Sequence, residues 1–338
     1  MDALMKRVLL ALFAAAFPLL TGCTRHSKSE HYYLVATNIN LPYWKTAADG
    51  FQAAADGFQA AAVQYGVTAE VWGPTTFDPQ DEVTEFHKIV ARKPAGILVS
   101  VANAGLMQPE IDAAMAAGIP VITIDSDAPA SHRLYFIGTN NLEAGRLGGE
   151  RVAAQLNGKG NVVFFTIAGQ PNLEERLKGY KDVFASSPGI KVVDVFDMKG
   201  DSGLAMDKAQ EYLGKTGKDK IDAMICLEAS AGKDVGEAYK RANVKDRLLV
   251  AMDVDTATLN LVKDGTIDST ISQKPYTMAF LGLKGLDDVH HYPVKPLTAD
   301  YGLDTLSPFP AFIDTGVSLI DKTNVDTLLN RSKAPASH

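Results

Sequence analysis

The stretch Val121-Ile122-Thr123-Ile124-Asp125 decides the fold class of this chain. Four β-branched residues in succession are typical of a strand that is covered on both faces, as the strands of parallel sheets are. The turn-forming sequences Gly118-Ile119-Pro120 and Ser126-Asp127-Ala128-Pro129 bound the run on either side. Ligands of open α/β sheets bind beyond the carboxyl ends of the strands, so Asp125 is a candidate ligand-binding residue.

On both sides of this strand the chain alternates between strand-like and helix-like segments. Strands are expected first at residues 32–37, 68–72, 96–101, 121–125 and 134–137. The pattern restarts near Asn140, with strands expected at residues 161–166, 191–196, 223–227, 248–252 and 267–272. Repeated strand–helix units indicate a doubly wound parallel sheet. We therefore predict an α/β protein with two such lobes, followed by a final strand over residues 311–320.

The first expected helix contains a tandem duplication. Pro42 is typical of a first helical position, and the helix is expected to run to about Tyr65. Within it, residues 48–54 and residues 55–61 both read ADGFQAA. An extra heptad rotates a helical face by only about 20° and lengthens the helix by about 10.5 Å. We interpret the repeat as a local duplication and expect the helix to overhang the sheet.

Length and charge narrow the class of protein. The 338 residues are enough for two domains. A formal net charge of −7 argues against nucleic acid as a partner, which would require a basic face. The same charge favours a soluble, monomeric surface.

The first 23 residues have the features of an export signal. Lys6 and Arg7 precede an apolar stretch at residues 8–20, which is too short to be a good transmembrane helix. Leu20-Thr21-Gly22-Cys23 resembles the lipobox of bacterial lipoproteins. That resemblance implies cleavage before Cys23, lipidation of its thiol and a mature protein anchored to a membrane, in the periplasm or at the cell surface. The alternative is an ordinary secretory signal with a chance cysteine.

The segments that flank the predicted lobes and the second cysteine indicate little about function. Residues 24–30 are expected to form a linker, and residues 331–338 a disordered tail. Cys226 lies in an apolar run and is the only cysteine besides Cys23. We therefore expect Cys226 to be a small buried residue without a disulfide partner.

Polar and aromatic residues follow several expected strands or begin the next helices. They are Tyr43, Trp44, Asp125, Arg176, Glu228, Asp253 and Gln273. Aromatic faces suit the C–H surfaces of a sugar ring, and planar polar groups can form paired hydrogen bonds with adjacent hydroxyls. Together they predict a cleft for a small polyhydroxylated molecule. The sequence contains no recognisable nucleophile–base pair, metal motif, P-loop or dinucleotide fingerprint, so we predict a binding protein without a cofactor or metal.

Five motifs in order resemble the ribose-binding group of type I periplasmic solute-binding proteins. The motifs are Asn40-Leu41-Pro42-Tyr43-Trp44, Val121-Ile122-Thr123-Ile124-Asp125, Glu175-Arg176-Leu177-Lys178-Gly179-Tyr180, Val250-Ala251-Met252-Asp253 and Ser272-Gln273-Lys274-Pro275. The resemblance covers residues 31–320. It implies a sugar-binding protein that closes like a hinged clamp and delivers its ligand to an ABC transporter permease.

The resemblance also implies the lobe boundaries and the role of each site residue. An N-terminal lobe would comprise residues 31–139 and 273–310, and a C-terminal lobe residues 140–272 and 311–330. The three hinge crossovers would lie near Thr139, Gln273 and Pro310. Tyr43 and Trp44 would stack on the sugar, whereas Asp125, Arg176, Asp253 and Gln273 would hydrogen-bond its hydroxyls.

Several positions depart from the pattern of the ribose-binding group. Leu41, Val101 and Ser126 stand where that group often has larger polar residues, and Glu228-Ala229 replaces a frequent Asn-Asp pair. Ribose itself is therefore disfavoured. The remaining hypotheses are a ligand with an apolar patch, a deoxy sugar, or a cationic or donor-rich group facing Glu228.

Three other functions are alternatives to transport. Sugar-responsive repressors share the two-lobe fold but carry an N-terminal helix-turn-helix, where this chain carries an export signal. Asp125 and Asp253 could form the carboxylate pair of a glycoside hydrolase, but no sequence feature indicates that one pKa is raised. A lipoprotein that presents its ligand to a chemoreceptor, including a furanose-type signal, remains the alternative that the sequence leaves open.

Overall fold

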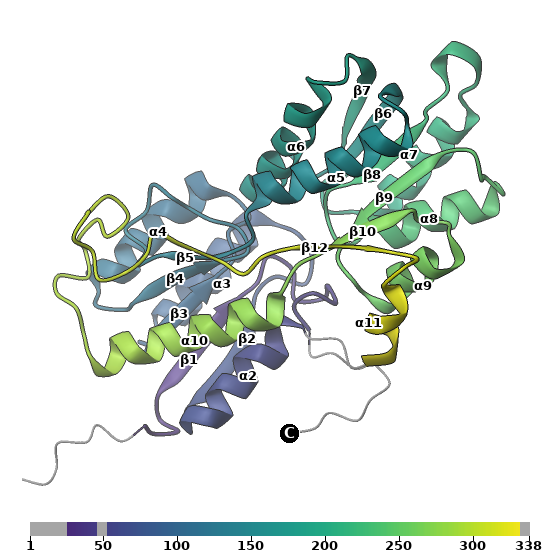
Figure 1. Ribbon diagram of the computed structural model, residues 1–338. Helices are drawn as coiled ribbons and strands as arrows, with labels where there is room; N and C mark the ends of the chain where they lie inside the picture. Colours follow the sequence, from purple (N-terminus) through teal and green to yellow (C-terminus); the bar gives the residue numbers. More distant parts are fainter. Residues whose placement is uncertain (1–25, 46–52, 332–338) are drawn as a thin grey trace, which may run out of the picture.

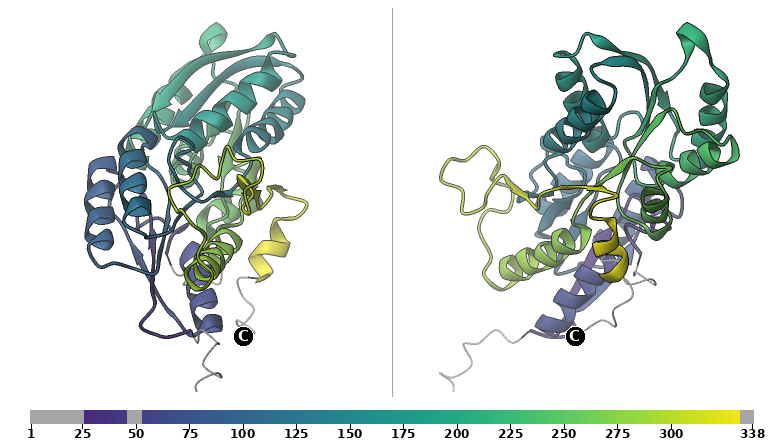
Figure 2. Two further views of the ribbon diagram at one scale, coloured as in Figure 1. Left: turned by 90° about the vertical axis from the view of Figure 1, so that its left-hand side faces the viewer. Right: turned by 45° about the vertical axis from the view of Figure 1, so that its right-hand side comes forward.

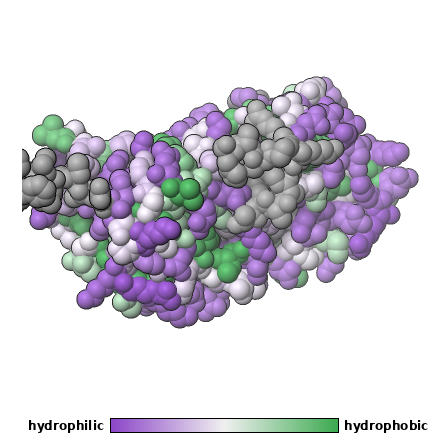
Figure 3. Space-filling view, turned by 90° about the horizontal axis from the view of Figure 1, so that it is seen from below, coloured by the Kyte–Doolittle hydropathy of each residue, from purple (hydrophilic) through white to green (hydrophobic). Residues whose placement is uncertain are grey.

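The computed structural model describes residues 26–45 and 53–331, which form two α/β lobes side by side (Figure 1). The predicted export signal, Cys23, most of the first heptad copy and residues 332–338 of the predicted tail lie outside the described residues, whereas Arg331 belongs to the last helix. Within the described part, no helix has the length and apolar character needed to cross a membrane. The face seen in Figure 3 is mainly hydrophilic, with hydrophobic residues in small scattered groups.

The first lobe is built on a six-stranded sheet of order β11-β5-β4-β3-β1-β2. All neighbouring pairs in it are parallel. Its strands are β1 (His31–Val35), β2 (Thr68–Trp72), β3 (Gly96–Val99), β4 (Val121–Ile124), β5 (Phe136–Gly138) and β11 (Phe312–Asp314). The helices α2 (Ala54–Tyr65) and α10 (Pro275–His291) pack together on the sheet, and α3 (Pro79–Val90) and α4 (Ala104–Ala116) form a second pair.

The second lobe has a six-stranded sheet of order β12-β10-β9-β8-β6-β7. Its strands are β6 (Lys159–Thr166), β7 (Gly189–Asp197), β8 (Ala223–Cys226), β9 (Leu248–Met252), β10 (Ser269–Ser272) and β12 (Ser318–Asp321). Only β12 runs antiparallel to its neighbour. The helices of the second lobe are α5 (Asn141–Gln155), α6 (Pro171–Phe184), α7 (Ser202–Gly214), α8 (Ala231–Arg241), α9 (Thr256–Asp264) and α11 (Val325–Arg331), with a short 3-10 helix η2 (Gly217–Asp219).

Each lobe has its own hydrophobic core. All four residues of β4 are buried, as a strand covered on both faces requires. Cys226 ends β8, where it is buried and unpaired among the described residues. The predicted α/β class with two doubly wound sheets is confirmed, and Figure 2 shows the two lobes from two further directions.

Three segments cross between the lobes. The first joins β5 to α5 through Thr139, and the second joins β10 to α10 through Gln273. The third lies at residues 315–317, between β11 and β12, where Gly316 adopts a positive φ of 79°. Glycine tolerates that backbone conformation, so the chain can turn from one sheet into the other.

The sequence prediction for the third crossover is therefore wrong. Residues 311–320 do not form one strand of the second lobe: β11 pairs with β5 in the first sheet, and β12 pairs with β10 in the second. The crossover lies beyond Pro310, and residues 312–314 belong to the first sheet. A single extended run does not reveal which strand it pairs with, and here its two halves have partners in different lobes.

The predicted start of the first helix is also wrong. Residues 42–44 form a turn, and α2 begins at Ala54, whose N–H donates to the Tyr43 carbonyl at 3.0 Å. The second heptad copy occupies α2: Phe58 is fully buried, and a Cβ on Gly57 would lie 2.1 Å from the Tyr276 carbonyl oxygen. The described helix α2 has 12 residues, and the predicted helical turns at residues 46–52 lie outside the described residues.

Candidate functional site

All seven residues singled out from the sequence line one cavity between the two lobes. Tyr43, Trp44, Asp125, Arg176, Glu228, Asp253 and Gln273 contribute to its wall. The cavity has a volume of about 40 Å³, room for only a few water molecules. A sugar ring therefore requires the lobes to separate or the lining side chains to move.

Asp125 and Asp253 occupy equivalent positions in the two lobes. Each follows a buried strand, β4 or β9, and each has a positive φ, 64° for Asp125 and 68° for Asp253. The Asp125 N–H donates to the Ile137 carbonyl, and the Asp253 N–H donates to the Ile271 carbonyl. Aspartate is among the few non-glycine residues that tolerate this conformation, and such backbone strain is frequent at functional sites. The strained turns direct two carboxylates from opposite lobes into one cavity.

The carboxylate of Asp125 receives hydrogen bonds from both lobes. The Tyr43 hydroxyl donates to its Oδ1 at 3.0 Å, and the Ser100 hydroxyl donates to its Oδ2 at 3.3 Å. From the second lobe, the Asn172 amide donates to Oδ2 at 3.3 Å. Asn172 begins α6 after Pro171, so this bond links the two lobes directly across the cleft.

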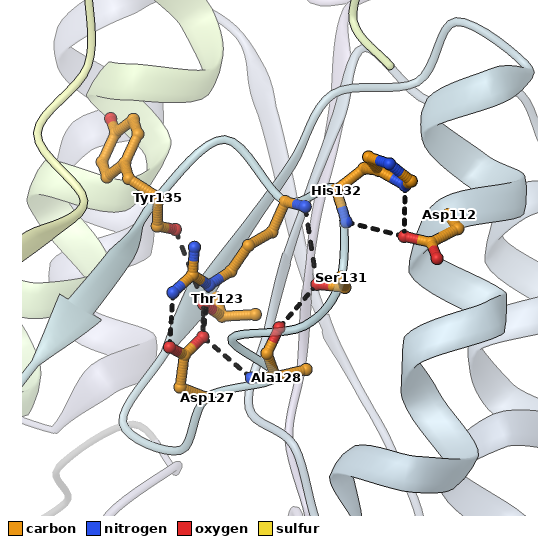
Figure 4. Close-up of polar contacts among 8 residues, drawn as sticks. Asp112, Thr123, Asp127, Ala128, Ser131, His132 and Tyr135 are labelled. Atoms are coloured by element: carbon orange, nitrogen blue, oxygen red, sulfur yellow. Dashed lines mark hydrogen bonds and ion pairs between the residues drawn. The ribbon is translucent and has the colours of Figure 1, made fainter. Parts of the chain in front are cut away.

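The loop behind Asp125 is held by a network of its own (Figure 4). The Asp127 carboxylate accepts from the Thr123 hydroxyl at 2.6 Å and from the Ala128 N–H at 2.8 Å, and it pairs with Arg133. Ser131 donates to the Ala128 carbonyl at 2.7 Å. Because these bonds close the loop upon itself, the backbone beside Asp125 is fixed before any ligand arrives.

Arg176 is the central cation of the cavity and is 3% exposed. Its Nε donates to Asn141 Oδ1 at 2.8 Å, its Nη1 to the Leu227 carbonyl at 2.8 Å and its Nη2 to Gln273 Oε1 at 3.0 Å. The neighbouring helices α5 and α6 pack closely enough that a Cβ on Gly145 would lie 2.1 Å from the Arg176 carbonyl oxygen. The close approach positions the Arg176 backbone, and the three acceptors hold the guanidinium in the cavity.

Gln273 lies on the second crossover and joins several parts of the site. Its Nε2 donates to both carboxylate oxygens of Asp253 at 3.2 Å. Its Oε1 accepts from Arg176 and from the Thr139 hydroxyl at 2.8 Å, so it also connects the first two crossovers. In this structure the amide of Gln273 orients Asp253 and Arg176.

Glu228 follows β8 and is held by the start of the next turn. Its Oε2 accepts from the Ser230 N–H at 2.8 Å and from the Ser230 hydroxyl at 2.5 Å. The other oxygen of this carboxylate has no hydrogen bond from the described residues. Glu228 therefore retains acceptor capacity toward the cavity.

Burial changes the ionisation of these acids. It raises the pKa of Asp125 and of Glu228, and Arg176 opposes the shift in both. It raises the pKa of Asp253 to about 7, again against the effect of Arg176, with the charge of Asp125 adding to the rise. Burial and the charge of Asp125 raise the pKa of Tyr43 well above its ordinary value. Because a protonated carboxyl both donates and accepts, Asp253 can offer either kind of hydrogen bond near neutral pH.

The aromatic part of the site comes from three residues. The Tyr43 and Trp44 rings meet edge to face, with centroids 4.7 Å apart, and Trp44 is 2% exposed. Phe77, from the first lobe, packs against the hydrophobic core of the second lobe. A Cβ on Gly200 would lie 2.5 Å from the Cβ of Phe77, which shows how tightly the lobes meet there.

Sequence reasoning missed several cavity residues. Phe77, Gln170, Asn172 and Ser230 line the cavity but were not singled out. The only signal for Asn172 was its place after Pro171, at the start of a helix that follows a strand. Phe77 had no signal, since it reaches the cavity from a loop whose path depends on the packing of both lobes.

Comparison with protein families matches residues 34–289 to the periplasmic binding protein domain. A sugar-binding protein of a sugar ABC transporter from Bacillus halodurans is 31% identical and has a TM-score of 0.73, covering 88% of this chain and 99% of that chain. An arabinose-binding protein from Geobacillus stearothermophilus is also 31% identical, with a TM-score of 0.70 and coverages of 88% and 98%.

A curated relative, the xylose/arabinose-binding protein of Sulfolobus acidocaldarius, is 24% identical over 282 residues. That match covers 78% of this chain and 66% of the relative, just under two thirds of its length. The family model extends from within β1 into the last turns of α10 and thus includes both lobes of the cleft. The chain belongs to the periplasmic binding protein domain family.

Proposed function

We propose that this chain binds a monosaccharide or a related small polyol between its two lobes and delivers it to an ABC transporter permease for import. The observation that carries the proposal is the convergence of Asp125, Asp253 and Arg176, from both lobes, with the aromatic pair Tyr43 and Trp44 in one cavity. Carboxylates and a guanidinium suit adjacent hydroxyls, and aromatic faces suit the C–H surface of a sugar.

The relatives support binding rather than catalysis. Those reported above are named for binding arabinose, xylose or a sugar, and two of them are more than 30% identical over most of the chain. The Bacillus halodurans protein is named as part of a sugar ABC transporter, which favours transport over the alternative of a ligand-presenting sensor. We infer that the chain works outside the cytoplasm, as proteins of this family do, and that Cys23 carries a lipid anchor on an otherwise monomeric protein.

The crossovers at Thr139, Gln273 and residues 315–317 would act as the hinge. Ligand binding favours closure because only the closed form brings groups from both lobes onto one molecule. The hydrogen bond from Asn172 to Asp125 and the packing of Phe77 on the second lobe are contacts that opening would break. The closed form is thus stabilised by a ligand that contacts both lobes at once.

Glu228 gives the site its proposed selectivity. Three buried carboxylates, Asp125, Glu228 and Asp253, surround one arginine, so the cavity is richer in acceptors than in donors. We therefore expect the preferred ligand to present hydroxyls as donors, or a cationic group, toward Glu228. Leu41 also lines the cavity and suits an apolar patch or a missing hydroxyl on the ligand.

The experiment is a thermal-shift screen of the purified protein against pentoses, hexoses, deoxy sugars, polyols and furanose signals. A ligand at 100 times its dissociation constant stabilises the folded state by about 2.7 kcal/mol, which is readily visible. Isothermal titration then compares the protein with Glu228→Gln and with Glu150→Gln, a control on the exposed side of α5. We expect weaker binding only in Glu228→Gln. No stabilisation by any compound would overturn the proposed sugar binding, and equal affinity in Glu228→Gln would overturn the selectivity argument alone.

A further inference from the structure

Two histidines and two carboxylates gather at the C-terminal end of α10, the end away from the crossover at Gln273. Asp287 and His291 lie one turn apart in the last part of α10, and His26 and Glu30 come from the segment that precedes β1. None of the four lines the cavity between the lobes. The site is therefore separate from ligand binding in the cleft.

The ligand atoms of three members of this cluster lie close together. Those of His26, Asp287 and His291 all lie within 4.8 Å of one another. The His26 Nε2 is 2.8 Å from Asp287 Oδ2, and the His291 Nε2 is 3.7 Å from Asp287 Oδ1. Glu30 Oε2 lies 2.9 Å from the same nitrogen of His291. A tetrahedral zinc ion with bonds of 2.0–2.2 Å separates its ligand atoms by about 3.4 Å, so small side-chain rotations suffice.

The surroundings resemble those of a metal site in two respects. The Tyr32 hydroxyl donates to Asp287 Oδ1 at 3.1 Å, the kind of outer hydrogen bond that orients a ligating carboxylate. The Asp287 and His291 side chains are only 3% and 8% exposed, whereas that of His26 is 37% exposed and offers a path for an ion.

Charge provides an independent argument. Among the described residues, no lysine or arginine forms an ion pair with Glu30 or Asp287, and their partners are the two histidines. A divalent cation balances two carboxylates while the histidines bind it as neutral imidazoles. The last turn of a helix also carries a partial negative charge, which favours a cation at this end of α10.

We propose that His26, Asp287 and His291 bind one divalent transition-metal ion of the zinc class, and that Glu30, which lies beside His291, turns to complete its coordination. The bound ion fastens the segment before β1 to the end of α10. Only Thr24 and Arg25 separate His26 from Cys23, so the ion fixes the lobe close to the proposed lipid anchor. The ligand pairs are 261 positions apart in the chain, which explains why their spacing gave no metal motif.

The experiment uses the purified protein, freed of metal, and zinc chloride or cobalt chloride as the only added probe. Zinc affinity is measured by competition with a chelating dye, and cobalt is followed by the visible absorption that a tetrahedral site produces. His26→Ala and His291→Ala are compared with His290→Ala, the exposed neighbouring histidine on the same helix. Tyr32→Phe tests the outer hydrogen bond.

We expect one ion per chain, at least 100-fold weaker zinc binding in His26→Ala and His291→Ala, and unchanged binding in His290→Ala. Tyr32→Phe weakens binding by about 10- to 100-fold, as loss of such outer partners does elsewhere. Absence of stoichiometric zinc binding would overturn the proposal and leave a hydrogen-bonded cluster only. Equal weakening in His290→Ala would do the same. Should His291→Ala fail to fold, the half-exposed His26 still provides the decisive variant.

Discussion

Removing the guanidinium of Arg176 tests the physical account of the cleft most directly. Arg176→Met keeps an unbranched side chain but removes donors from three buried acceptors, Asn141 Oδ1, the Leu227 carbonyl and Gln273 Oε1. Gln273 Oε1 keeps the Thr139 hydroxyl as a donor, so only the other two acceptors are counted as unpaired. Each buried acceptor left without a partner costs about 1–3 kcal/mol, so these two together cost at least about 2 kcal/mol. Domains typically have 5–15 kcal/mol of stability in total, so the change is readily measured.

The cost in Arg176→Met depends on pH in a defined direction. Arg176 lowers the pKa values of Asp125, Glu228 and Asp253 in the folded protein, so its loss raises all three further. At pH 5 Asp253, whose pKa is already about 7, is protonated in the folded variant and needs no countercharge. At pH 8 both states of the buried Asp253 carboxyl cost free energy. Ionisation places an uncompensated charge in the cavity, and protonation requires binding a proton at a pH above the pKa of the carboxyl in the unfolded chain. The variant therefore loses more stability at pH 8 than at pH 5.

Urea denaturation at pH 5 and pH 8, followed by circular dichroism without sugar, measures both effects. Arg146→Met is the matched control, because Arg146 lies on α5 with its side chain 41% exposed and pairs with the exposed Glu143. Exposed ion pairs contribute little, so the control should change stability by less than about 1 kcal/mol. A loss below about 1 kcal/mol in Arg176→Met, or equal losses at the two pH values, would refute the account.

Three further predictions concern ionisation, closure and packing. Burial raises the pKa of Asp253 in the folded protein to about 7. The protonated Asp253 carboxyl therefore contributes its full share to the free energy of unfolding below about pH 4, and this share is lost as the pH rises through 7. Asp253→Asn should flatten the fall in melting temperature between pH 5 and pH 8, and an unchanged slope would contradict this. Phe77→Ala removes an interlobe contact and should weaken binding of the sugar identified in the screen several-fold by titration calorimetry, with little change in unfolding. Gly145→Ala places a Cβ against the Arg176 carbonyl oxygen and should cost about 1–3 kcal/mol in urea denaturation. Gly214→Ala, whose Cβ would meet nothing within 4 Å, should be neutral or stabilising, and similar losses in both variants would argue against the packing explanation.

Local sequence was sufficient to predict most of the helices and strands and much of the candidate site. The apolar run at residues 121–124 forms a fully buried strand, and Asp125 follows it directly. Buried parallel strands need continuous apolar runs, and their carboxyl ends meet at one edge, so local sequence is sufficient to place such residues. For the same reason Glu228 and Asp253 could be assigned to the cleft without knowledge of the packing between the lobes.

Tertiary structure decided where chain segments with similar local preferences go. The extended residues 312–321 pair with two different sheets, since strand propensity says nothing about the pairing partner. The two copies of the duplicated heptad have identical local propensities, so only the packing reveals that the second copy lies in α2, with Gly57 against Tyr276.

Long-range contacts account for what remained hidden in the sequence. Asn172 reaches Asp125 from the opposite lobe, and Phe77, a residue of the first lobe, packs on the hydrophobic core of the second lobe. His26 meets Asp287 across almost the whole chain. Periodicity and turn chemistry act over a few residues, whereas these contacts depend on how two sheets, three crossovers and the closing helix α10 are placed in space. That placement is set by the total burial of both cores, which no local pattern contains.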